Sequence, residues 1–511
     1  MAYSHSPGIV ELLALRARLN DLVDKLVDAE VDLPSSNDSS GWFPPQRTEI
    51  PAIAACCAQI QALVSGPTYT LHQAFAFHVP SYLRIAIEAH VEETLREAQE
   101  CGKSALHVRI IAKSSNVCPE KLARVLRLLA AHHIFREVRL DTFARNRCSS
   151  ALDTGKSVAE LTNTNDFYHD TTGFAALIAH TADDVFKASA YAAEAVLSPQ
   201  TSHSYDIRDS PFALAFSNPS KSDPITIFEF FARKSNAHRL TRFGAAVKYA
   251  GMAFSGGADN ILAGFPWAEL KEGAVVVDVG GGIGQVALTI AEAFPQVRVV
   301  VQDLVDVIRD ARPFWKASAP RDLESGRVTL MEYDFFEEQP VRKADVYVLR
   351  AIVHDWADVH AVAILARVAE AASSQTRLLV IEQHINYLCS PNPFPPVSTM
   401  PYLMDAQLMV AVNALERTQP QYEAIAAKAG WRLARVWKTG PNAQEGPYRH
   451  YEFRLAPAER ARSTSTRTAE KKNVQRELRS SPSSATSVSS TQTSPVIASK
   501  PPNGLVGQIV A

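Results

Sequence analysis

A histidine and two glutamates in this sequence have the types and surroundings that proton transfer requires. His354 stands in an H-D-W step shortly after the apolar run DVYVL, Glu382 ends the apolar run RLLVIE, and Glu416 opens an E-R-T step. A neutral imidazole, with an ordinary pKa of about 6.5, can take a proton near neutral pH. A carboxylate bonded to its N–H would fix the tautomer and stabilise the imidazolium. We therefore predict that His354 is a general base supported by Glu382 and Glu416.

The same residues also have simpler interpretations. Glu416 followed by Arg417 could form a surface ion pair, and His354 could be a buried, hydrogen-bonded histidine. The three histidines His354, His360 and His384 do not have the spacing of a compact ligand set such as H-E-x-x-H, so we predict no metal site. The position of His354 after a strand, beside an aspartate, favours a role in chemistry.

A glycine-rich stretch, V-D-V-G-G-G-I-G, follows an apolar run and opens a helix. Glycine lets the backbone turn tightly and approach a ligand closely. A dinucleotide fingerprint, G-x-G-x-x-G, that began at Gly280 would meet Gln285 in place of its third glycine. The form D-x-G-x-G-x-G, from Asp278 to Gly284, fits instead and resembles motif I of S-adenosylmethionine-dependent methyltransferases. We expect Asp278 to order the loop and face the cofactor's ammonium group, with Gly280 and Gly282 against the cofactor.

Further acidic positions indicate a bound nucleoside. Asp303 lies at the end of the next apolar run, VVVQDL, where a carboxylate can accept hydrogen bonds from both ribose hydroxyls. Asp334 and Phe335 follow the third strand, where the acid can bind the adenine amino group and the ring can stack on the base. NAD enzymes place an acid such as Asp303 in the same way, and acid–aromatic steps are common in loops. These residues therefore predict a nucleoside cofactor without naming which one.

These side chains need a sheet to position them. Four apolar runs look like buried parallel strands with helical stretches between them: AVVVDV, VRVVV, DVYVL and RLLVIE. The alternation predicts a doubly wound α/β sheet over residues 256–455, with ligands bound outside the carboxyl ends of its strands. Near its end, LARVWKT and HYEFRL could form an antiparallel pair at the sheet edge.

Residues 49–255 predict a mainly helical domain. Within them, LHVRIIAKSSNVCPEKLARVLRLLAAHHIFREV has the rhythm of a helix, a turn, a helix that begins near Pro119, and a short strand pair, which is winged-helix-like. We interpret this segment as a packing or dimerisation module. The alternative is a DNA-binding regulator in which Lys121, Arg124 and Arg127 face phosphate. The apolar character of the second helix disfavours it, as does the near-balance of 52 Lys+Arg against 54 Asp+Glu.

The two ends of the chain differ from the rest. Residues 1–48 hold one amphipathic helix and a linker, whereas residues 456–511 form a Ser/Thr-rich tail that we expect to be disordered. From Ser480 to Ser494, eleven of fifteen residues are Ser or Thr, a composition that cannot bury enough apolar surface to fold. The total of 511 residues, 46% of them hydrophobic, suits two or three domains.

Composition also limits the cellular setting. No run approaches the roughly 20 apolar residues of a membrane-spanning helix, and the N-terminus lacks the features of a secretory signal. The six cysteines are scattered, without a C-x-x-C pair. We therefore expect a cytoplasmic protein with reduced thiols that binds neither nucleic acid nor membrane.

With these motifs in place, the sequence resembles the plant and fungal small-molecule O-methyltransferases of the caffeate and isoflavone type, over roughly residues 80–455. The resemblance implies S-adenosylmethionine as cofactor, a small hydroxylated aromatic acceptor, and a homodimer held by the winged-helix-like domain. His354 would be the general base, with Glu382 and Glu416 as its supports. The implied cofactor contacts are Gly280, Asp303, Asp334, Phe335 and Arg350, which stands where plant members usually carry lysine.

The acceptor pocket is where this sequence departs from the family. The resemblance implies substrate contacts at Phe243, Met252, Asp355, Met409 and Asn413. The proline-rich stretch SPNPFPPVSTMP and the loss of two residues between Asn413 and Glu416 are departures from the pattern. We expect a phenolic hydroxyl on a small aromatic or polyketide-type secondary metabolite, while an enol or carboxylate would suit the same base and cofactor.

Other functions are compatible with parts of this pattern. A nicotinamide-dependent oxidoreductase would share the sheet and Asp303, but the third fingerprint glycine is missing. A family member could use the cofactor for chemistry other than methyl transfer, although the intact His354 and both glutamates count against it. A winged-helix regulator is the third alternative. The residues favour a direct in-line methyl transfer, in which positioning supplies much of the rate.

Overall fold

The computed structural model describes residues 6–31, 33, 35, 49–163, 167–217, 224–253, 257–386, 399–437 and 448–457. The predicted disorder of the Ser/Thr-rich tail concerns residues that lie almost wholly outside these ranges. Most of the proline-rich stretch also lies outside them, as does the side chain of Met252.

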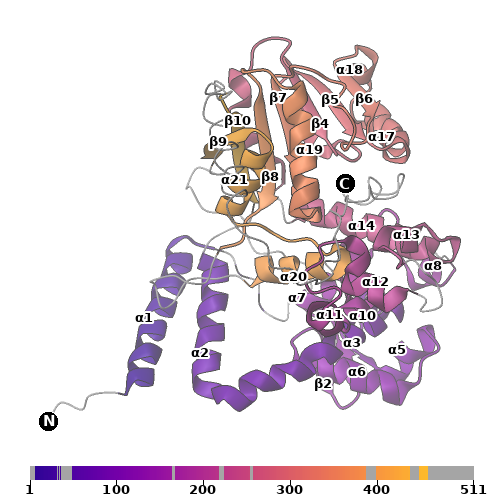
Figure 1. Ribbon diagram of the computed structural model, residues 1–511. Helices are drawn as coiled ribbons and strands as arrows, with labels where there is room; N and C mark the ends of the chain where they lie inside the picture. The colour runs from indigo at the N-terminus through magenta and orange to yellow at the C-terminus, as the bar shows by residue number, and fades with distance from the viewer. Residues whose placement is uncertain are drawn as a thin grey trace, which may run out of the picture.

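A seven-stranded sheet dominates the C-terminal half of the chain (Figure 1), with strand order β6-β5-β4-β7-β8-β10-β9. The first five strands are parallel, and β10 runs antiparallel to both of its neighbours. The predicted doubly wound sheet is confirmed, and so is the antiparallel pair, although β10 lies inside the sheet and only β9 is at the edge. The strands are β4 (Val275–Val279), β5 (Arg298–Asp303), β6 (Val328–Glu332), β7 (Val346–Arg350), β8 (Arg377–Gln383), β9 (Trp431–Trp437) and β10 (Tyr448–Leu455).

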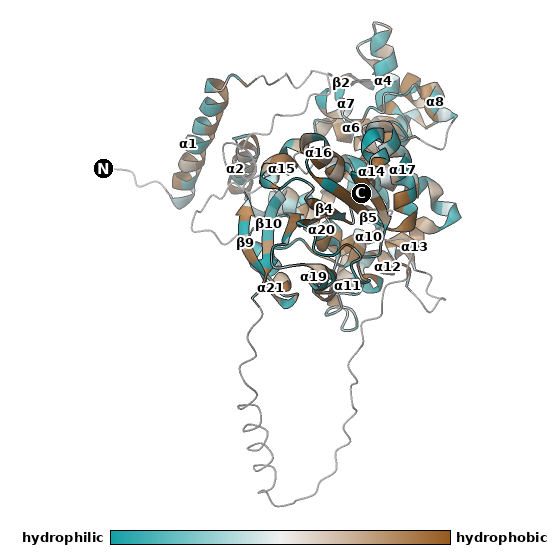
Figure 2. Ribbon diagram, turned by 90° about the horizontal axis from the view of Figure 1, so that it is seen from above, coloured by the Kyte–Doolittle hydropathy of each residue, from teal (hydrophilic) through white to brown (hydrophobic). Residues whose placement is uncertain are grey.

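The central strands are apolar on both faces because helices cover both. Val276 and Val346 pack with Trp315 on one face, and Val277 and Tyr347 lie on the other. Figure 2 shows the hydrophobic strands β4 and β5 near the centre of the molecule. This two-sided burial explains why the strands read as continuous apolar runs. The covering helices are α16 (Gln285–Ala293), α17 (Val305–Ser318), α18 (Pro320–Glu324), α19 (Asp358–Ala371) and α21 (Gln419–Lys428).

The segment before the sheet is mainly helical, as predicted, and Figure 1 shows it grouped below the sheet. Helix α20 (Met400–Val412) comes late in the chain but returns to this helical part, where Val410 and Ala411 bury against Phe212 and Ile227. The helices used below are α3 (His78–Glu88), α9 (Phe174–His180), the π-helix η2 (Thr181–Val185), α10 (Phe186–Ser189), α12 (Pro211–Phe216), α13 (Ile227–Ala232), α14 (Ala237–Ala253) and α15 (Gly257–Ala263). The remaining short helices are α4 (Val91–Glu100), α7 (Arg147–Ser150), α8 (Val158–Thr162) and α11 (Ala192–Leu197).

The predicted helix, turn, helix and strand pair is confirmed near the start of the helical part. Pro119 is the first residue of the second helix, and Leu122, Leu126 and Leu129 bury its inner face. On its outer face Arg127 is paired with two carboxylates of the hairpin, so this guanidinium is already engaged within the chain. The elements are β1 (Leu106–His107), α5 (Val108–Ser114), α6 (Pro119–Ala131), β2 (Arg136–Arg139) and β3 (Thr142–Ala144).

The N-terminal helix α1 (Pro7–Asp28), predicted from its periodicity, packs along α2 (Glu49–His72), and both stand apart from the body in Figure 1. Within the described residues, one helical stretch, Glu49–Glu88, is long and apolar enough to cross a membrane by length and composition, and an 18-residue window in it has a mean hydropathy of 1.3. The prediction that no segment could span a membrane was wrong for this stretch, because that prediction rested on unbroken apolar runs. This stretch mixes apolar with small polar residues, and Gly66 (φ 73°) breaks its helical geometry.

Candidate active site

The glycine loop joins β4 to α16 at the carboxyl edge of the sheet. Gly280 and Gly282 have φ angles of 70° and 60°, in the left-handed region that favours glycine. A Cβ atom at Gly281 would lie 2.6 Å from Oδ2 of Asp278, so any larger residue would collide with that carboxylate. Gly281 also lines a cavity. The loop therefore presents bare backbone to the cavity while it covers Asp278.

Asp303, the last residue of β5, is hydrogen-bonded to this loop. Its Oδ2 accepts a hydrogen bond from the backbone N–H of Gly282 at 2.9 Å, and its Oδ1 accepts one from Leu304 at 2.7 Å. Burial raises the pKa of Asp303 to about 7. Each carboxylate oxygen keeps a lone pair that can accept a hydrogen bond from a diol.

Asp278 is a buried carboxylate whose Oδ2 has no hydrogen-bond partner within the described residues. Burial raises its pKa to about 7, against the opposing charge of Arg350. A buried polar atom without a partner requires an explanation, and a ligand ammonium would pair with it. The unpaired acid, the bare glycine loop and the diol acceptor at Asp303 together fit a nucleoside cofactor that carries an amino-acid group.

Asp334 and Phe335 lie just after β6. Asp334 accepts a hydrogen bond from the backbone N–H of Phe336 at 3.0 Å and so shapes the turn. The Phe335 ring lies 3.6 Å from the place where a Cβ of Gly280 would be, and it meets Trp356 edge-on. The ring is therefore beside the glycine loop, within reach of a ligand held there.

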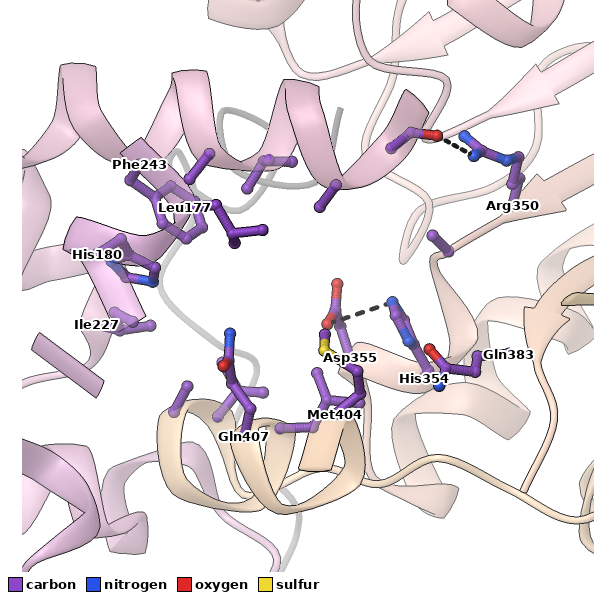
Figure 3. A pocket seen from close by; sticks show the side chains of 18 of the residues that line it. Leu177, His180, Ile227, Phe243, Arg350, His354, Asp355, Gln383, Met404 and Gln407 are labelled. Carbon is purple, nitrogen blue, oxygen red and sulfur yellow. Dashed lines mark hydrogen bonds and ion pairs between the residues drawn. The ribbon is translucent and has the colours of Figure 1, made fainter. Parts of the chain in front are cut away.

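The short 3₁₀ turn η6 (Val353–Asp355) presents His354 to the same edge of the sheet. The His354 Nδ1 lies 3.0 Å from Glu416 Oε1 and 3.8 Å from Glu382 Oε2. Its Nε2 lies 3.6 Å from Asp355 Oδ1, the contact that Figure 3 marks with a dashed line. Burial disfavours the imidazolium, but the charges of Asp355, Glu416 and Glu382 outweigh it and raise the pKa of His354 well above its ordinary value. The structure brings the predicted histidine and both glutamates together.

The two glutamates differ in what they hold. Glu416 contacts the imidazole directly, and its backbone N–H donates to Asp405 at 2.8 Å. Glu382 accepts hydrogen bonds from the backbone N–H groups of Ile352 and Val353 at 3.0 and 2.6 Å. Burial raises the pKa of Glu382 to about 7. Glu416 is therefore the direct partner of the imidazole, whereas Glu382 mainly fixes the turn that carries it.

Arg417 is a contributor that the sequence analysis did not identify. Its side chain is fully buried and donates to the backbone carbonyls of Val353 at 2.8 Å and Trp356 at 2.7 Å. It also pairs with Asp358 at 2.8 Å. Within the described residues, Glu416 and Arg417 do not form the surface ion pair that the sequence allowed. Both side chains are buried: Glu416 contacts the His354 imidazole, and Arg417 binds backbone carbonyls around η6. The E-R-T step was the signal available in the sequence, but a role was predicted only for its glutamate.

Arg350 ends β7 and bridges the sheet to the helical part. Its Nη2 donates to the carbonyl of Gly251 on α14 at 2.7 Å, and its guanidinium lies over the Tyr448 ring at 5.8 Å. Its charge also acts on Asp278. The cation predicted here is therefore present at the boundary between the glycine loop and α14.

A cavity of about 200 Å³ extends from Gly281 past His354 into the helical part (Figure 3). Of the predicted acceptor contacts, Phe243 and Asp355 line it. Met409 is exposed on the opposite side of α20, and Asn413 ends that helix with its amide on the Ser204 and Asp206 carbonyls, so neither reaches the cavity. The residues of α20 that do line it are Met404, Gln407, Leu408, Ala411 and Val412, and their helical spacing was the signal available in the sequence.

Comparison with known proteins agrees with this geometry. A sequence model of the O-methyltransferase domain matches residues 257–432. The 4-O-methyltransferase 1 of Phanerochaete chrysosporium is 37% identical over 417 residues, which are 77% of this chain and 85% of that protein. The sterigmatocystin 8-O-methyltransferase of Aspergillus flavus is 27% identical over 442 residues, 84% of this chain and 95% of that protein.

Solved structures share the fold. OxaC in complex with S-adenosylhomocysteine and oxaline has a TM-score of 0.62 and 20% identity, over 87% of this chain and 99% of that one. A pericyclic reaction enzyme has a TM-score of 0.64 and 19% identity, over 88% of this chain and 100% of that one. Together with the O-methyltransferase model and its relatives, the glycine loop and its acids define a methyltransferase that uses S-adenosylmethionine. The chain belongs to the O-methyltransferase family.

Proposed function

We propose that this enzyme methylates a phenolic hydroxyl of a small aromatic or polyketide-type secondary metabolite, with His354 as the general base. The observation that carries the proposal is the position of His354. Its Nδ1 is bonded to Glu416, and it lines a cavity that also contains the glycine loop. Because Nδ1 is occupied, Nε2 is the nitrogen that can serve an acceptor in the cavity.

Proton removal is the task that the residues of this chain perform. S-adenosylmethionine, when bound, supplies an electrophilic methyl group. His354 Nε2 takes the acceptor's hydroxyl proton as the new oxygen–carbon bond forms and the sulfur–carbon bond breaks, because a phenol with a pKa of about 10 is otherwise a poor nucleophile. Glu416 stabilises the resulting imidazolium, and Glu382 keeps the turn in place. Asp355 lies beside Nε2 and can hold the acceptor hydroxyl.

Cofactor contacts follow from the same geometry. Asp278 would pair with the ammonium group, Asp303 with the ribose diol, and Phe335 with the adenine ring. Gly280 and Gly282 would allow the close backbone approach, and Arg350, bonded to the Gly251 carbonyl on α14, would place its positive charge near Asp278. The positive charge of a bound sulfonium would oppose that of the imidazolium and so lower the pKa of His354, which frees Nε2 for proton uptake.

The acceptor class rests on the cavity and on the relatives. The cavity walls are largely apolar, with polar groups gathered around His354 and at a few other points, which suits an aromatic ring with oxygen substituents. The names of the relatives and neighbours mention sterigmatocystin and oxaline, which are small-molecule acceptors or ligands of those proteins. If this enzyme catalysed a reaction other than methyl transfer, as the structurally similar pericyclic reaction enzyme does, it would leave no methylated product.

The test is methyl transfer from labelled S-adenosylmethionine to a panel of phenols by the purified enzyme. We expect a labelled methyl ether from the wild-type protein and a loss of about 100-fold or more in His354→Ala, the range typical of a lost general base. Binding of S-adenosylhomocysteine is measured alongside and should be retained by the variant. Retained binding of S-adenosylhomocysteine with no methylated product from any phenol in the panel would reject the proposal.

We also propose that the enzyme is a cytoplasmic homodimer that binds neither nucleic acid nor membrane. The support is the apolar surface that the N-terminal helices expose, which includes Val27, Leu71 and Phe75 at 68%, 74% and 66%. A surface of this kind favours a protein partner or a membrane over water. Family resemblance favours the second copy of the chain, and the whole-molecule prediction below separates the two.

A further inference from the structure

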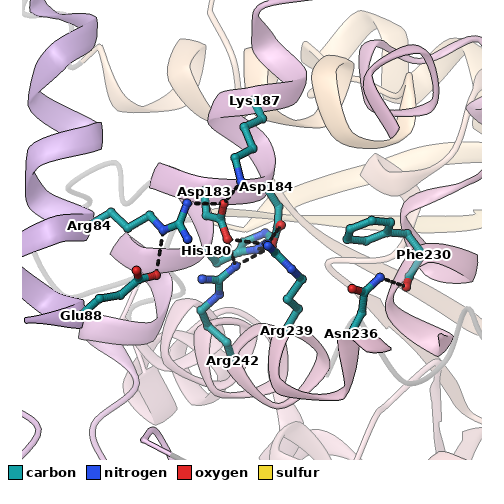
Figure 4. Close-up of polar contacts among 10 residues, drawn as sticks. All are labelled: Arg84, Glu88, His180, Asp183, Asp184, Lys187, Phe230, Asn236, Arg239 and Arg242. Carbon is teal, nitrogen blue, oxygen red and sulfur yellow. Dashed lines mark hydrogen bonds and ion pairs between the residues drawn. The ribbon is translucent and has the colours of Figure 1, made fainter. Parts of the chain in front are cut away.

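A buried cluster of charged residues lies behind the far wall of the cavity. Asp183 and Asp184, in the π-helix η2, have exposures of 1% and 0%. Arg239 and Arg242 of α14 each contact both carboxylates, as Figure 4 shows. Arg84 at 2.6 Å and Lys187 at 2.5 Å are the further cations on Asp183. Although burial opposes ionisation, the contact with His180 and the charge of Arg242 lower the pKa of Asp184, so the cluster holds a fixed carboxylate.

His180 joins this cluster to the cavity. It is the last residue of α9, it lines the cavity, and its Nδ1 lies 3.5 Å from Asp184 Oδ2 without a hydrogen bond of good geometry. The Phe243 ring meets it edge-on at 4.9 Å. Figure 3 shows the His180 ring on the wall opposite His354 and Asp355, facing into the cavity. Nothing in the proton transfer described above uses this second histidine.

The carboxylate decides which tautomer His180 adopts. A lone pair on Nδ1 would face the charge of Asp184, so Nδ1 carries the proton. Burial and the charge of Arg242 lower the pKa of His180, which is therefore neutral near pH 7. Its other nitrogen, Nε2, is left with a lone pair, which makes it a hydrogen-bond acceptor. An acceptor in an apolar wall selects a ligand that brings a donor to it.

We propose that His180 is a specificity-determining residue that accepts a hydrogen bond from a second hydroxyl of the substrate, across the aromatic ring from the oxygen that is methylated. The proposal rests on the proposed function and narrows its substrate class to aromatics with at least two hydroxyl groups. Asp184 and its arginines act as positioning residues, because they fix the tautomer of His180 without touching the substrate.

The experiment measures acceptor binding by isothermal titration to the complex of the full chain with S-adenosylhomocysteine, so that no turnover is needed. The probes are matched pairs of phenols that differ by one hydroxyl group at the meta or para position, or on a second fused ring. The variants are His180→Phe, which keeps an aromatic ring but removes the lone pair, and His180→Gln, whose amide oxygen can replace it. The exposed His169 supplies a control, His169→Gln.

We expect wild type and His169→Gln to prefer the dihydroxylated member of at least one pair by about 10-fold, the worth of one well-placed hydrogen bond. His180→Phe should abolish that preference while its affinity for the monohydroxylated member stays within about 2-fold, and His180→Gln should restore part of it. An unchanged preference in His180→Phe, an equal loss of both affinities in a variant that still binds S-adenosylhomocysteine, or no preference in the wild type would overturn the proposal.

Methylation of the same pairs separates this inference from the proposed function. If the binding preference depends on His180 but no phenol is methylated, the specificity role stands and the phenol methyltransferase proposal fails. If phenols are methylated but the preference is independent of His180, the reverse holds.

Discussion

At the level of single residues, proton removal by His354 depends on how the surrounding carboxylates set the pKa of its imidazole. Removing the charge of Glu416 should lower the pKa of His354, because that carboxylate is one of the charges that raise it. Since kcat/KM reports the free enzyme, its acid limb should lie above pH 6.5 in the wild type and move to lower pH in Glu416→Gln. The variant's maximal rate should also fall by about 10- to 100-fold, because the imidazolium loses its partner.

The measurement is the pH profile of kcat/KM for wild type, Glu416→Gln and Glu370→Gln, the last an exposed glutamate of α19. The control should leave the profile unchanged. An acid limb that stays in place in Glu416→Gln would mean that this carboxylate does not set the proton affinity of the base.

A second residue-scale prediction concerns Asp278, whose unpaired carboxylate should cost stability in the absence of cofactor. Its folded pKa of about 7 exceeds the unfolded value of about 3.9, so folding takes up a proton. The stability contributed by this group is therefore complete below about pH 4 and is lost as pH rises through about 7. Asp278→Asn should raise the Tm of the cofactor-free protein by a few degrees at pH 8, by about 2–4 °C per kcal/mol gained.

The same substitution should weaken S-adenosylhomocysteine binding by about 10-fold or more, since a charge-assisted hydrogen bond to the ammonium group is lost. Thermal unfolding at pH 5 and pH 8 and calorimetric titration measure the two effects. A variant that is less stable at pH 8, or that binds the cofactor product as tightly as wild type, would contradict the role given to Asp278.

At this scale the sequence predicted the residues that follow strands better than those on helices. His354, Glu382 and Asp303 could be placed because parallel strands end at one edge, and that edge is where ligands bind. Met409 and Asn413 are not among the residues that line the cavity, because a position on a helix depends on its rotation, which no local motif reports. His180 was missed because its partners, Asp184, Arg239 and Arg242, come together only through tertiary packing.

At the element scale, the 3₁₀ turn η6 is held in place from both sides. Glu382 binds its backbone N–H groups, and Arg417 binds the carbonyls of Val353 and Trp356. The strand pattern in the sequence predicted the position of this turn. It did not predict the hydrogen bonds from Arg417 that hold the turn, because in the sequence Arg417 is indistinguishable from a surface arginine. The individual strands and the helix, turn, helix and hairpin were predictable because each has its own hydrophobic period.

Arg417→Leu should therefore lower kcat by about 100-fold, although Arg417 does not contact the substrate, because the displaced turn moves His354 from its productive position. It should also lower stability, since two buried carbonyls lose their donor. Arg417→Lys should restore part of the rate, as a single charge can reach one carbonyl. The positioning role predicts a fall in kcat with an unchanged KM for S-adenosylmethionine.

The measurement is steady-state kinetics with thermal unfolding, and Arg309→Leu is the matched control because Arg309 is exposed on α17. Surface pairs of that kind contribute little to stability. If Arg417→Leu lost stability but kept a normal kcat at a temperature where it is folded, the turn would not need this anchor.

At the scale of the whole molecule, the edge of the sheet forms one side of the cavity, and α9, α13, α14 and α20 form the other. The proposed homodimer predicts a sedimenting mass of twice the chain mass of 55.9 kDa. Replacing the exposed Leu71 and Phe75 by aspartate should shift the protein toward the monomer, because charge on an apolar contact surface opposes association. Sedimentation equilibrium checks the mass, and flotation with lipid vesicles checks the membrane alternative raised by Glu49–Glu88. A monomeric wild type would contradict the dimer, and vesicle binding that the two substitutions abolish would contradict the proposal that the enzyme does not bind membrane.

Single-turnover rates with phenols of graded pKa show whether His354 removes the acceptor proton during methyl transfer. With wild type, the rate should vary little with acceptor pKa, because the base ionises each phenol in place. With His354→Ala, ordinary phenols should react about 100-fold or more slowly, whereas an electron-poor phenol already ionised at the assay pH should react at nearly the wild-type rate. An equal loss for ionised and un-ionised phenols would contradict proton removal by His354 and leave it a structural residue of the site.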